Sequence, residues 1–262
     1  MFPLSDDIRS HRMPLVNWIV IGVCSFMFLM QVLAGPKGGL VVERLGMVPA
    51  RLTVPAGEVL AVPEQAIVAT IFGYQRVERL RPLEPAAIPE WLTLLTFIFL
   101  HGGWLHFLGN MWFLHVFGDN VEDRLGHAAF AVLYLGCGFI SGIMHMVTNF
   151  DSVIPTIGAS GAIAGVMGAY MLMFPRAQVM TVIPMIFFWP IWVIPAPVFL
   201  GVWFGLQFFN GAFVMHDTQA GGVAWWAHIG GFVAGAAIAA GLNVLHGDRA
   251  TVSHARDPEL DN

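Results

Sequence analysis

The stretch at residues 155–174 reads PTIGASGAIAGVMGAYMLMF and sets the prediction for the whole chain. Its glycines at positions 161, 165 and 168 fall on one face of a helix, because residues three and four apart share a face. In membranes, a face of small residues lets a neighbouring helix approach almost to backbone contact. Ser160 stands at the start of this face, so it can reach a group carried by the neighbour.

The predicted neighbour is residues 226–241, WAHIGGFVAGAAIAAG. Its small residues also recur at helical spacing, and His228 is the ionisable residue beside them. A serine and a histidine on two closely packed helices suggest a nucleophile and its base. The residues predicted to pack the helices at this site are Gly158, Gly161, Gly165, Gly231 and Gly235, with Ala227 and Ala239 continuing the second face.

The composition indicates a multi-span membrane protein. Of the 262 residues, 57% are hydrophobic and 11% are charged, whereas soluble domains carry about 25% charged residues. The net charge of −5 comes with no basic patch, so nucleic acid is not a predicted partner. Cys24 and Cys137 both lie in hydrophobic runs, so no disulfide framework is predicted.

We therefore predict an all-α membrane protein, a polytopic bundle of about six transmembrane helices. The acidic N-terminus is interpreted as a retained tail rather than a cleaved signal. The predicted segments are a cytoplasmic N-terminal tail at 1–14, a first transmembrane helix at 15–34, a long extracytoplasmic loop at 35–90, a helical core at 91–245 and a cytoplasmic C-terminal tail at 246–262. The further predicted spans are 104–117, 128–147, 155–174, 198–209 and 223–245.

Several segments are predicted to lie outside regular spans. Residues 35–90 contain prolines at seven positions, with an amphipathic or interfacial element expected around 66–74. Residues 91–100 are too short to span and are predicted to lie against the membrane surface. Residues 118–127, GDNVEDRLGH, are predicted to form a charged turn. The prolines within 175–197 predict an irregular segment along the membrane interface, because a regular helix cannot run through that density.

Basic residues indicate the orientation. The termini and the connections at 118–127 and 175–178 carry arginines, whereas 148–156 and 211–222 contain no Lys or Arg. Short cytoplasmic loops are enriched in basic residues, so both termini are predicted to be cytoplasmic.

Two polar residues of the span at 104–117 are candidates for stabilising an oxyanion. His106 and Asn110 are four residues apart, so they share a helix face, and both can donate hydrogen bonds. Ser160 stands at a helix start, where backbone N–H groups are free. These three residues predict an oxyanion pocket. His228 would act as general base and then as acid. Because no carboxylate lies in the apolar spans near Ser160 or His228, a Ser–His dyad is predicted rather than a triad.

Each candidate also has a structural interpretation. A serine in a membrane helix is usually a small packing residue, and a lone intramembrane histidine can bind a carbonyl or a ligand. His101 would shape the substrate entrance or simply end the surface segment. Packing, pore-lining or interface roles are the expectation for His115, His145, Trp225 and Trp226. The occurrence together of the four site candidates in otherwise apolar spans favours function.

The sequence resembles the rhomboid family of intramembrane serine proteases, in its bacterial form, over roughly residues 91–241. HGGWLHFLGNMWFLHVFGDNVEDRLG resembles the family's second span and charged turn, and its His and Asn fall on His106 and Asn110. GASGAIAG resembles the serine motif and places the nucleophile at Ser160. AHIGGFVAG resembles the motif of the last span and places the base at His228. In the charged turn, the matching residues are Glu122 and Arg124.

The resemblance implies six helices and cleavage of other membrane proteins' spans at or near the outer surface. It implies no metal, no nucleotide and no other cofactor; the partners are transmembrane protein substrates and the lipid bilayer. The implied location is a bacterial inner membrane, with the active site facing the extracytoplasmic side. The chain departs from the pattern at Ala164, where some members carry a tyrosine that stacks on the base, so the orientation of His228 stays open. The sequence does not set the oligomeric state.

The serine helix is short for a membrane span. A helix over residues 158–174 would be about 25 Å long, against a hydrocarbon core of roughly 30 Å. If its lower end reaches the cytoplasmic face, Ser160 lies below the outer surface, in a recess. A substrate helix would then have to unwind locally to expose a carbonyl.

Three other functions compete with the protease. A catalytically silent relative would bind membrane clients, but such proteins typically lack the serine or the histidine. A transporter or channel would use His and Asn to line a pathway, but the halves of the chain show no inverted repeat. A metal site is suggested by six histidines in or near spans, at 101, 106, 115, 127, 145 and 228. Against it, the apolar runs contain no acids and the sequence has no HExxH.

Overall fold

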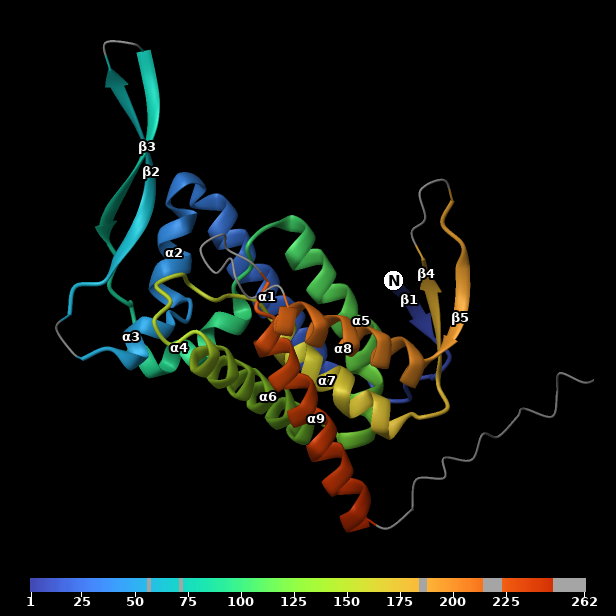
Figure 1. The fold of residues 1–262 in the computed structure, drawn as a ribbon. Helices are drawn as coiled ribbons and strands as arrows, with labels where there is room; N and C mark the ends of the chain where they lie inside the picture. Colours follow the sequence, from blue (N-terminus) through green and yellow to red (C-terminus); the bar gives the residue numbers. More distant parts are fainter. Residues whose placement is uncertain (56–57, 71–72, 184–187, 214–222, 247–262) are drawn as a thin grey trace, which may run out of the picture.

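The computed structural model describes residues 1–55, 58–70, 73–183, 188–213 and 223–246 and shows a helical bundle with two small β-sheets beside it (Figure 1). The main helices of the bundle are α1 (Leu15–Leu33), α5 (Trp104–Leu125), α6 (His127–Thr148), α7 (Ser160–Met173), α8 (Ala196–Phe213) and α9 (Trp225–His246). Helix α7 is central, because it contacts α5, α6, α8 and α9.

The predicted polytopic helical bundle is confirmed. Within the described residues, α1, α6 and Trp225–Leu242 of α9 are each long and apolar enough to cross a membrane, and the bent pair Glu90–Phe99 with α5 makes a fourth candidate. Helix α7 is apolar but has only 14 residues. A count of six spans requires α7 and α8 to cross as well, and it stays a prediction.

The charged turn predicted at 118–127 is wrong, because α5 continues through it to Leu125. The carboxylate of Glu122 is 1% exposed and accepts hydrogen bonds from the backbone N–H groups of Val16 (2.8 Å) and Asn17 (2.7 Å). It thus satisfies free donors at the start of α1 and opposes the positive end of that helix. The turn comes at Gly126 instead, whose φ of 80° favours glycine.

The segment predicted to lie against the membrane surface at 91–100 is helical, and its position relative to the membrane stays a prediction. It forms η2 (Glu90–Leu92), α4 (Thr93–Thr96) and η3 (Phe97–Phe99), and its bend from α5 measures 81°. Phe97 and Ile98 are buried because α6 has glycines opposite them. A Cβ on Gly138 would lie 3.2 Å from Ile98, and one on Gly142 would lie 3.0 Å from Phe97.

The proline-rich segment at 175–197 and the N-terminal tail are more regular than predicted. Strands β4 (Gln178–Val182) and β5 (Ile191–Pro195) pair antiparallel, and β1 (Phe2–Asp6) adds to β4, giving the order β1-β4-β5. Pro190 and Pro195 stand at the limits of β5, where a missing N–H is tolerated. Trp112 of α5 holds β1 against the bundle by donating its indole N–H to the carbonyl of Pro3, at 2.6 Å.

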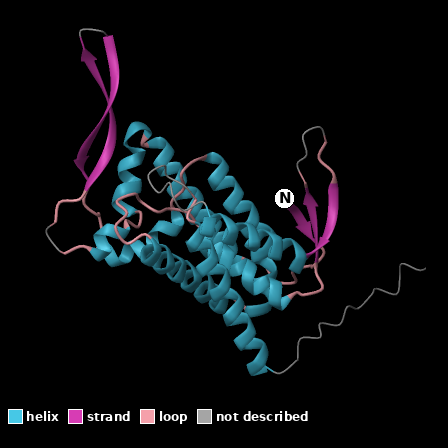
Figure 2. Cartoon of the chain, viewed as in Figure 1, coloured by secondary structure: helices cyan, strands magenta, loops and turns pink. Residues whose placement is uncertain are grey.

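The long loop at 35–90 has secondary structure of its own. It contains η1 (Gly35–Lys37), α2 (Gly38–Leu45), α3 (Pro49–Thr53) and an antiparallel hairpin of β2 (Ala61–Thr70) and β3 (Gly73–Pro82). The element predicted around 66–74 falls in this hairpin, with 71–72 outside the described residues. The hairpin and the three-stranded sheet lie on opposite sides of the bundle (Figure 2).

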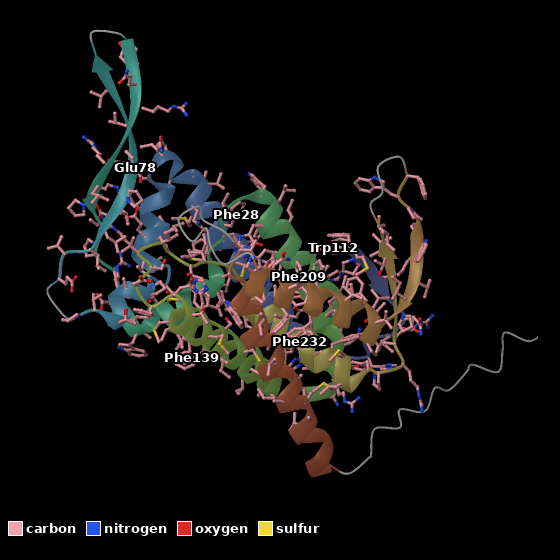
Figure 3. All side chains as sticks on the ribbon, viewed as in Figure 1. Phe28, Glu78, Trp112, Phe139, Phe209 and Phe232 are labelled. Carbon is pink, nitrogen blue, oxygen red and sulfur yellow. The ribbon has the colours of Figure 1, made fainter. Side chains whose placement is uncertain are left out.

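Polar contacts tie the base of the hairpin and α3 to α2. Arg81 contacts the carboxylate of Glu43, and Arg51 donates to the backbone carbonyl of Glu43 at 2.6 Å. Burial alone would raise the pKa of Glu43, but the hydrogen bond from Arg81 and the nearby charges of Arg81 and Arg51 lower it below the ordinary value. Farther out, Glu78 lies on the projecting part of the hairpin, whereas Phe232 lies within the bundle (Figure 3).

The predicted C-terminal tail after His246, where α9 ends, and most of the loop at 211–222 lie outside the described residues.

Candidate active site

Helices α7 and α9 meet at near backbone contact, as the small-residue faces require. A Cβ on Gly231 would collide with the carbonyl oxygen of Gly161, and one on Gly235 would collide with that of Gly165. On its other side, α7 packs on α6, where a Cβ on Gly165 would also collide with Cys137. The backbone of α7 therefore lies directly against that of α9, while the small side chains of Cys137 and Ser141 fill the space between α7 and α6. This packing fixes Ser160 relative to α9.

Gly158 has a different role from the other predicted packing glycines. Its φ is 129°, a conformation that favours glycine. A Cβ here would lie 2.7 Å from Cε1 and 2.8 Å from Nε2 of His106. The backbone before α7 therefore passes close to a side chain of α5 rather than to α9. The backbone N–H of Gly158 donates to the carbonyl of Phe97 at 2.9 Å.

The structure places Ser160 and His228 in contact. Ser160 Oγ lies 2.7 Å from Nε2 of His228, which is the geometry of a hydroxyl donating to an imidazole. His228 is 7% exposed, and its Nδ1 lies 2.8 Å from Oε1 of Gln207 on α8. Gln207 was missed in the sequence analysis. The available signal was an amide within an otherwise apolar span, and such residues are functional candidates.

Aromatic rings from α8 and α9 flank the imidazole. The Trp203 ring is 5.9 Å from the His228 ring at an interplanar angle of 35°, and the Trp225 ring is 6.3 Å away at 89°. Ala164, which stands where some family members have a stacking tyrosine, is fully buried. The rings around His228 therefore come from helices other than α7.

His106 and Asn110 lie in the same cavity as Ser160. Nδ1 of His106 accepts from the backbone N–H of Gly102 at 3.3 Å, which leaves the proton of the neutral ring on Nε2. Nδ2 of Asn110 is buried and has no hydrogen-bond partner within the described part of the chain. Both residues thus line the cavity that contains Ser160, and each side chain has an N–H with no acceptor among the described residues, so both are candidates for the donors of an oxyanion pocket.

His101 lies behind this pocket, not at its mouth. It is 2% exposed, and its ring is 5.4 Å from that of His106. The side chain of Gln31 holds its backbone twice, donating to the carbonyl at 3.0 Å and accepting from the N–H at 3.1 Å. Of the two interpretations of His101, this arrangement favours the one in which it ends the segment at 91–100 over the one in which it shapes the substrate entrance.

The site opens into a cavity of about 820 Å³. Its lining includes Ser160, His228, His106, Asn110 and Gln207, together with His145, Asn149, Trp225 and Trp226. No Asp or Glu is among the described residues that line it. His115 is exposed on α5 and is not part of the lining. The described residues contain no group of three or more His, Cys, Asp or Glu side chains that could hold a metal ion.

Comparison with known proteins gives the family. Residues 89–243, more than half of the chain, match the family model described as the Rhomboid domain. The chain belongs to the rhomboid family. Its match includes the helices that carry Ser160, His228, His106 and Asn110 but leaves out α1, β1 and the β2–β3 hairpin. This rhomboid is a multi-pass integral membrane protein.

Curated relatives match over shorter stretches. The putative rhomboid protease YdcA of Bacillus subtilis (strain 168) is 42% identical over 85 residues, which are 32% of this chain and 42% of the relative. Rhomboid protease GluP of the same organism is 41% identical over 80 residues, 30% of this chain and 15% of the relative. RHOMBOID-like protein 5 of Arabidopsis thaliana is 33% identical over 96 residues, 36% of this chain and 31% of the relative. The chain therefore covers less than half the length of each of these relatives.

Proposed function

We propose that this rhomboid is an intramembrane serine endopeptidase that hydrolyses peptide bonds in or near transmembrane segments of other membrane proteins. The observation that carries the proposal is the 2.7 Å contact between Ser160 Oγ and His228 Nε2, in a cavity that His106 and Asn110 also line. Membership of a family with bacterial relatives named as proteases supports the same activity.

In the proposed mechanism, Ser160 attacks the scissile carbonyl while His228 Nε2 takes the hydroxyl proton. The carbonyl oxygen becomes an oxyanion, which accepts hydrogen bonds from Asn110 Nδ2, from His106 Nε2–H and from the backbone N–H of Ser160. That N–H is among the first of α7, which have no acceptor within the helix. His228 then gives its proton to the leaving amine, and an acyl-enzyme on Ser160 remains. Water hydrolyses it by the same steps, with His228 again as the base.

The position of the nucleophile supports a substrate that is unwound at the cut. Helix α7 has 14 residues, which is about 21 Å of helix against a hydrocarbon core of roughly 30 Å. Ser160 therefore lies within the depth of the membrane if the other end of α7 reaches the opposite face. In a regular substrate helix, the backbone carbonyls accept hydrogen bonds within the helix. The substrate must therefore unwind over a short stretch before Ser160 can attack one of them.

The orientation is part of the same proposal. Arginines near the termini and in the connections on the same side favour cytoplasmic termini, and the site then faces the extracytoplasmic side, in a bacterial inner membrane. Accessibility of an engineered cysteine near Ser152, beside the cavity, to an impermeant thiol reagent in intact cells tests this. Protection of that cysteine until the membrane is opened would contradict the orientation.

Purified protein in liposomes, incubated with a model transmembrane substrate and with a fluorophosphonate probe, tests the activity. The protease should cut the substrate in or near its span, and the probe should label Ser160, as shown by mass spectrometry of the labelled peptide. Folded protein that binds the substrate but neither cuts it nor takes up the probe would identify a silent client-binding protein instead.

A further inference from the structure

We infer that Gln207 is a positioning residue that selects the tautomer and fixes the ring plane of His228. The inference rests on the proposed function, since it assigns how the general base is prepared. Gln207 does not touch the scissile bond in this account. It acts on the ring nitrogen that faces away from Ser160.

The hydrogen bond itself dictates the tautomer. Oε1 of Gln207 is an acceptor only, so the contact at 2.8 Å requires the proton of the neutral imidazole on Nδ1. Nε2 then carries the lone pair, and it is this atom that lies 2.7 Å from Ser160 Oγ. With the opposite tautomer, Nε2 would present a proton to the serine and could not accept one. The amide oxygen therefore selects the form of His228 that works as a base.

The surroundings give this hydrogen bond more weight than one at a surface. Gln207 is 8% exposed and His228 is 7% exposed, so water competes little for either group. Trp203 lies four residues before Gln207 on the same face of α8, and its ring flanks the imidazole. One helix thus supplies both a polar contact at the edge of the ring and an aromatic contact beside it. These contacts orient His228 where α7 has only Ala164.

The partner is neutral, which distinguishes it from the carboxylate of a Ser–His–Asp triad. The described lining of the cavity has no Asp or Glu, and the other titratable groups on it are His106 from α5 and His145 from α6. Gln207 therefore orients the ring but adds no negative charge to stabilise the imidazolium that forms when Ser160 attacks. A carboxylate at the same position would do both, which makes the two contributions separable by experiment.

The test compares Gln207→Leu with Gln207→Glu in the full chain in liposomes, using a cleavable model transmembrane substrate. Leu keeps much of the volume but removes the acceptor. We expect kcat to fall about 10- to 100-fold while KM changes by less than about twofold. Glu keeps the acceptor and adds charge. We expect it to retain cleavage at high pH and to move the acid limb of the pH–rate profile upward by about one unit, because a carboxylate stabilises the imidazolium.

Phe208→Leu is the matched control. Phe208 is the next residue of α8, is 52% exposed, and should tolerate the change without an effect on kcat or on the pH profile. Retention of wild-type kcat by Gln207→Leu, or an unmoved acid limb in Gln207→Glu, would overturn the role given to Gln207. If Gln207→Leu fails to fold, the profile of Gln207→Glu decides alone.

A measurement on the resting protein separates this inference from the proposed function. The ¹⁵N chemical shifts of the His228 ring report which nitrogen carries the proton. Wild type should show protonated Nδ1, and Gln207→Leu should show a mixture of the two tautomers. Cleavage by wild type with an unchanged tautomer in Gln207→Leu would refute the role of Gln207 and leave the protease intact. If wild type shows protonated Nδ1 but neither cuts the substrate nor takes up the probe, the protease is refuted and the tautomer assigned to His228 stands.

Discussion

The two ends of α7 both carry polar side chains, but the surroundings of those side chains differ. At the first end, Ser160 meets His228 at the edge of a cavity of about 820 Å³. Near the last turn, the Tyr170 hydroxyl donates to the carboxylate of Asp6 at 2.5 Å, and Asn120 donates to the same carboxylate at 2.8 Å. Tyr170 is fully buried, and the cavity does not extend to it.

The difference shows how one helix can hold both a reactive group and a structural one. Polar groups at the Ser160 end face open space, so a substrate can complete their hydrogen bonds. At the other end, Tyr170 and Asn120 both donate to the carboxylate of Asp6 and hold strand β1 against α5 and α7. Changes at the first end should therefore alter cleavage more than stability, and changes at the other end should do the opposite.

The largest expected effect is at the Ser160 end. Ser160→Ala and His228→Ala should each lower kcat by at least about 10³-fold, because the nucleophile or its base is gone, while the thermal midpoint changes little. Cleavage of a model transmembrane substrate and thermal unfolding measure the two effects. The controls are Ser25→Ala on α1 and His115→Ala on the outer face of α5, which should cut normally. Cleavage by Ser160→Ala at a wild-type rate would remove the assigned nucleophile.

The next effect is at the seam between α7 and α9. Gly231→Val places a side chain against the carbonyl of Gly161, so the helices must separate. We expect loss of cleavage and about 1–3 kcal/mol of stability, the usual cost of overpacking. Gly241→Val on the same helix is the control, because a Cβ there meets none of the described atoms within 4 Å. A Gly231→Val protein with normal activity would contradict the close-packing argument.

Loss of one oxyanion donor should have a smaller effect. Asn110→Ala removes a buried Nδ2 that has no partner among the described residues. Removing a single donor of this kind typically costs about 10²- to 10³-fold in kcat. With His106 and the Ser160 N–H still present, we expect the lower end of this range. Steady-state kinetics should show the loss in kcat rather than in KM. A fall in stability without a fall in kcat would make Asn110 a structural residue.

At the Tyr170 end, stability should respond and chemistry should not. Tyr170→Phe deletes the hydroxyl that donates to Asp6, which should cost about 1–3 kcal/mol of the free energy of unfolding and change kcat less than about threefold. Thermal or denaturant unfolding in detergent measures the first effect, and the cleavage assay measures the second. Tyr74→Phe, at an exposed position on the hairpin, is the control for the substitution itself.

The smallest expected effect is a pH dependence of stability from Asp6. Burial raises the pKa of Asp6 to about 6, the hydrogen bond from Tyr170 opposes this rise, and the charge of Asp119 adds to it. The folded state therefore favours protonated Asp6, and this contribution is present below the unfolded pKa of about 3.8 and is lost as pH rises through about 6. Because Asp6 is partly exposed, we expect roughly 1–2 kcal/mol.

The thermal midpoint measured from pH 4 to pH 7.5 tests this, with Asp6→Asn as the variant that should flatten the curve. Asp151→Asn, in an exposed turn, should leave the curve as it is. A midpoint for wild type that rises across this range would have the opposite sign and would contradict the raised pKa of Asp6.

The sequence predicted the helices best where an apolar run is long enough to be a membrane span and is not interrupted by charged residues or prolines. The predicted spans at 15–34 and 128–147 agree closely with α1 and α6. The two packed faces were also predictable, because glycine spacing alone defines them. The charged turn was mispredicted because the partners that satisfy Glu122 lie on α1, more than a hundred residues earlier in the chain.

Long-range pairing explains the remaining differences. Strand β1 is extended because it pairs with β4, which comes after α7 in the sequence. No local pattern in the N-terminal residues indicates that partner. The same limit applies to Gln207. An amide in an apolar helix is visible in the sequence, but only the fold shows that it lies against the far side of the histidine ring.

Glu122 also has a consequence for the biogenesis of the protein. At the start of α1, the backbone N–H groups of Val16 and Asn17 donate to a carboxylate that lies 105 residues downstream of Asn17. While the chain is being synthesised, α1 therefore enters the membrane with an open first turn, which only water or lipid headgroups can satisfy. In a ribosome-bound chain that ends before α5, the first turn of α1 should be open to protease. Protection of that turn should appear in longer chains in which Glu122 has left the ribosome.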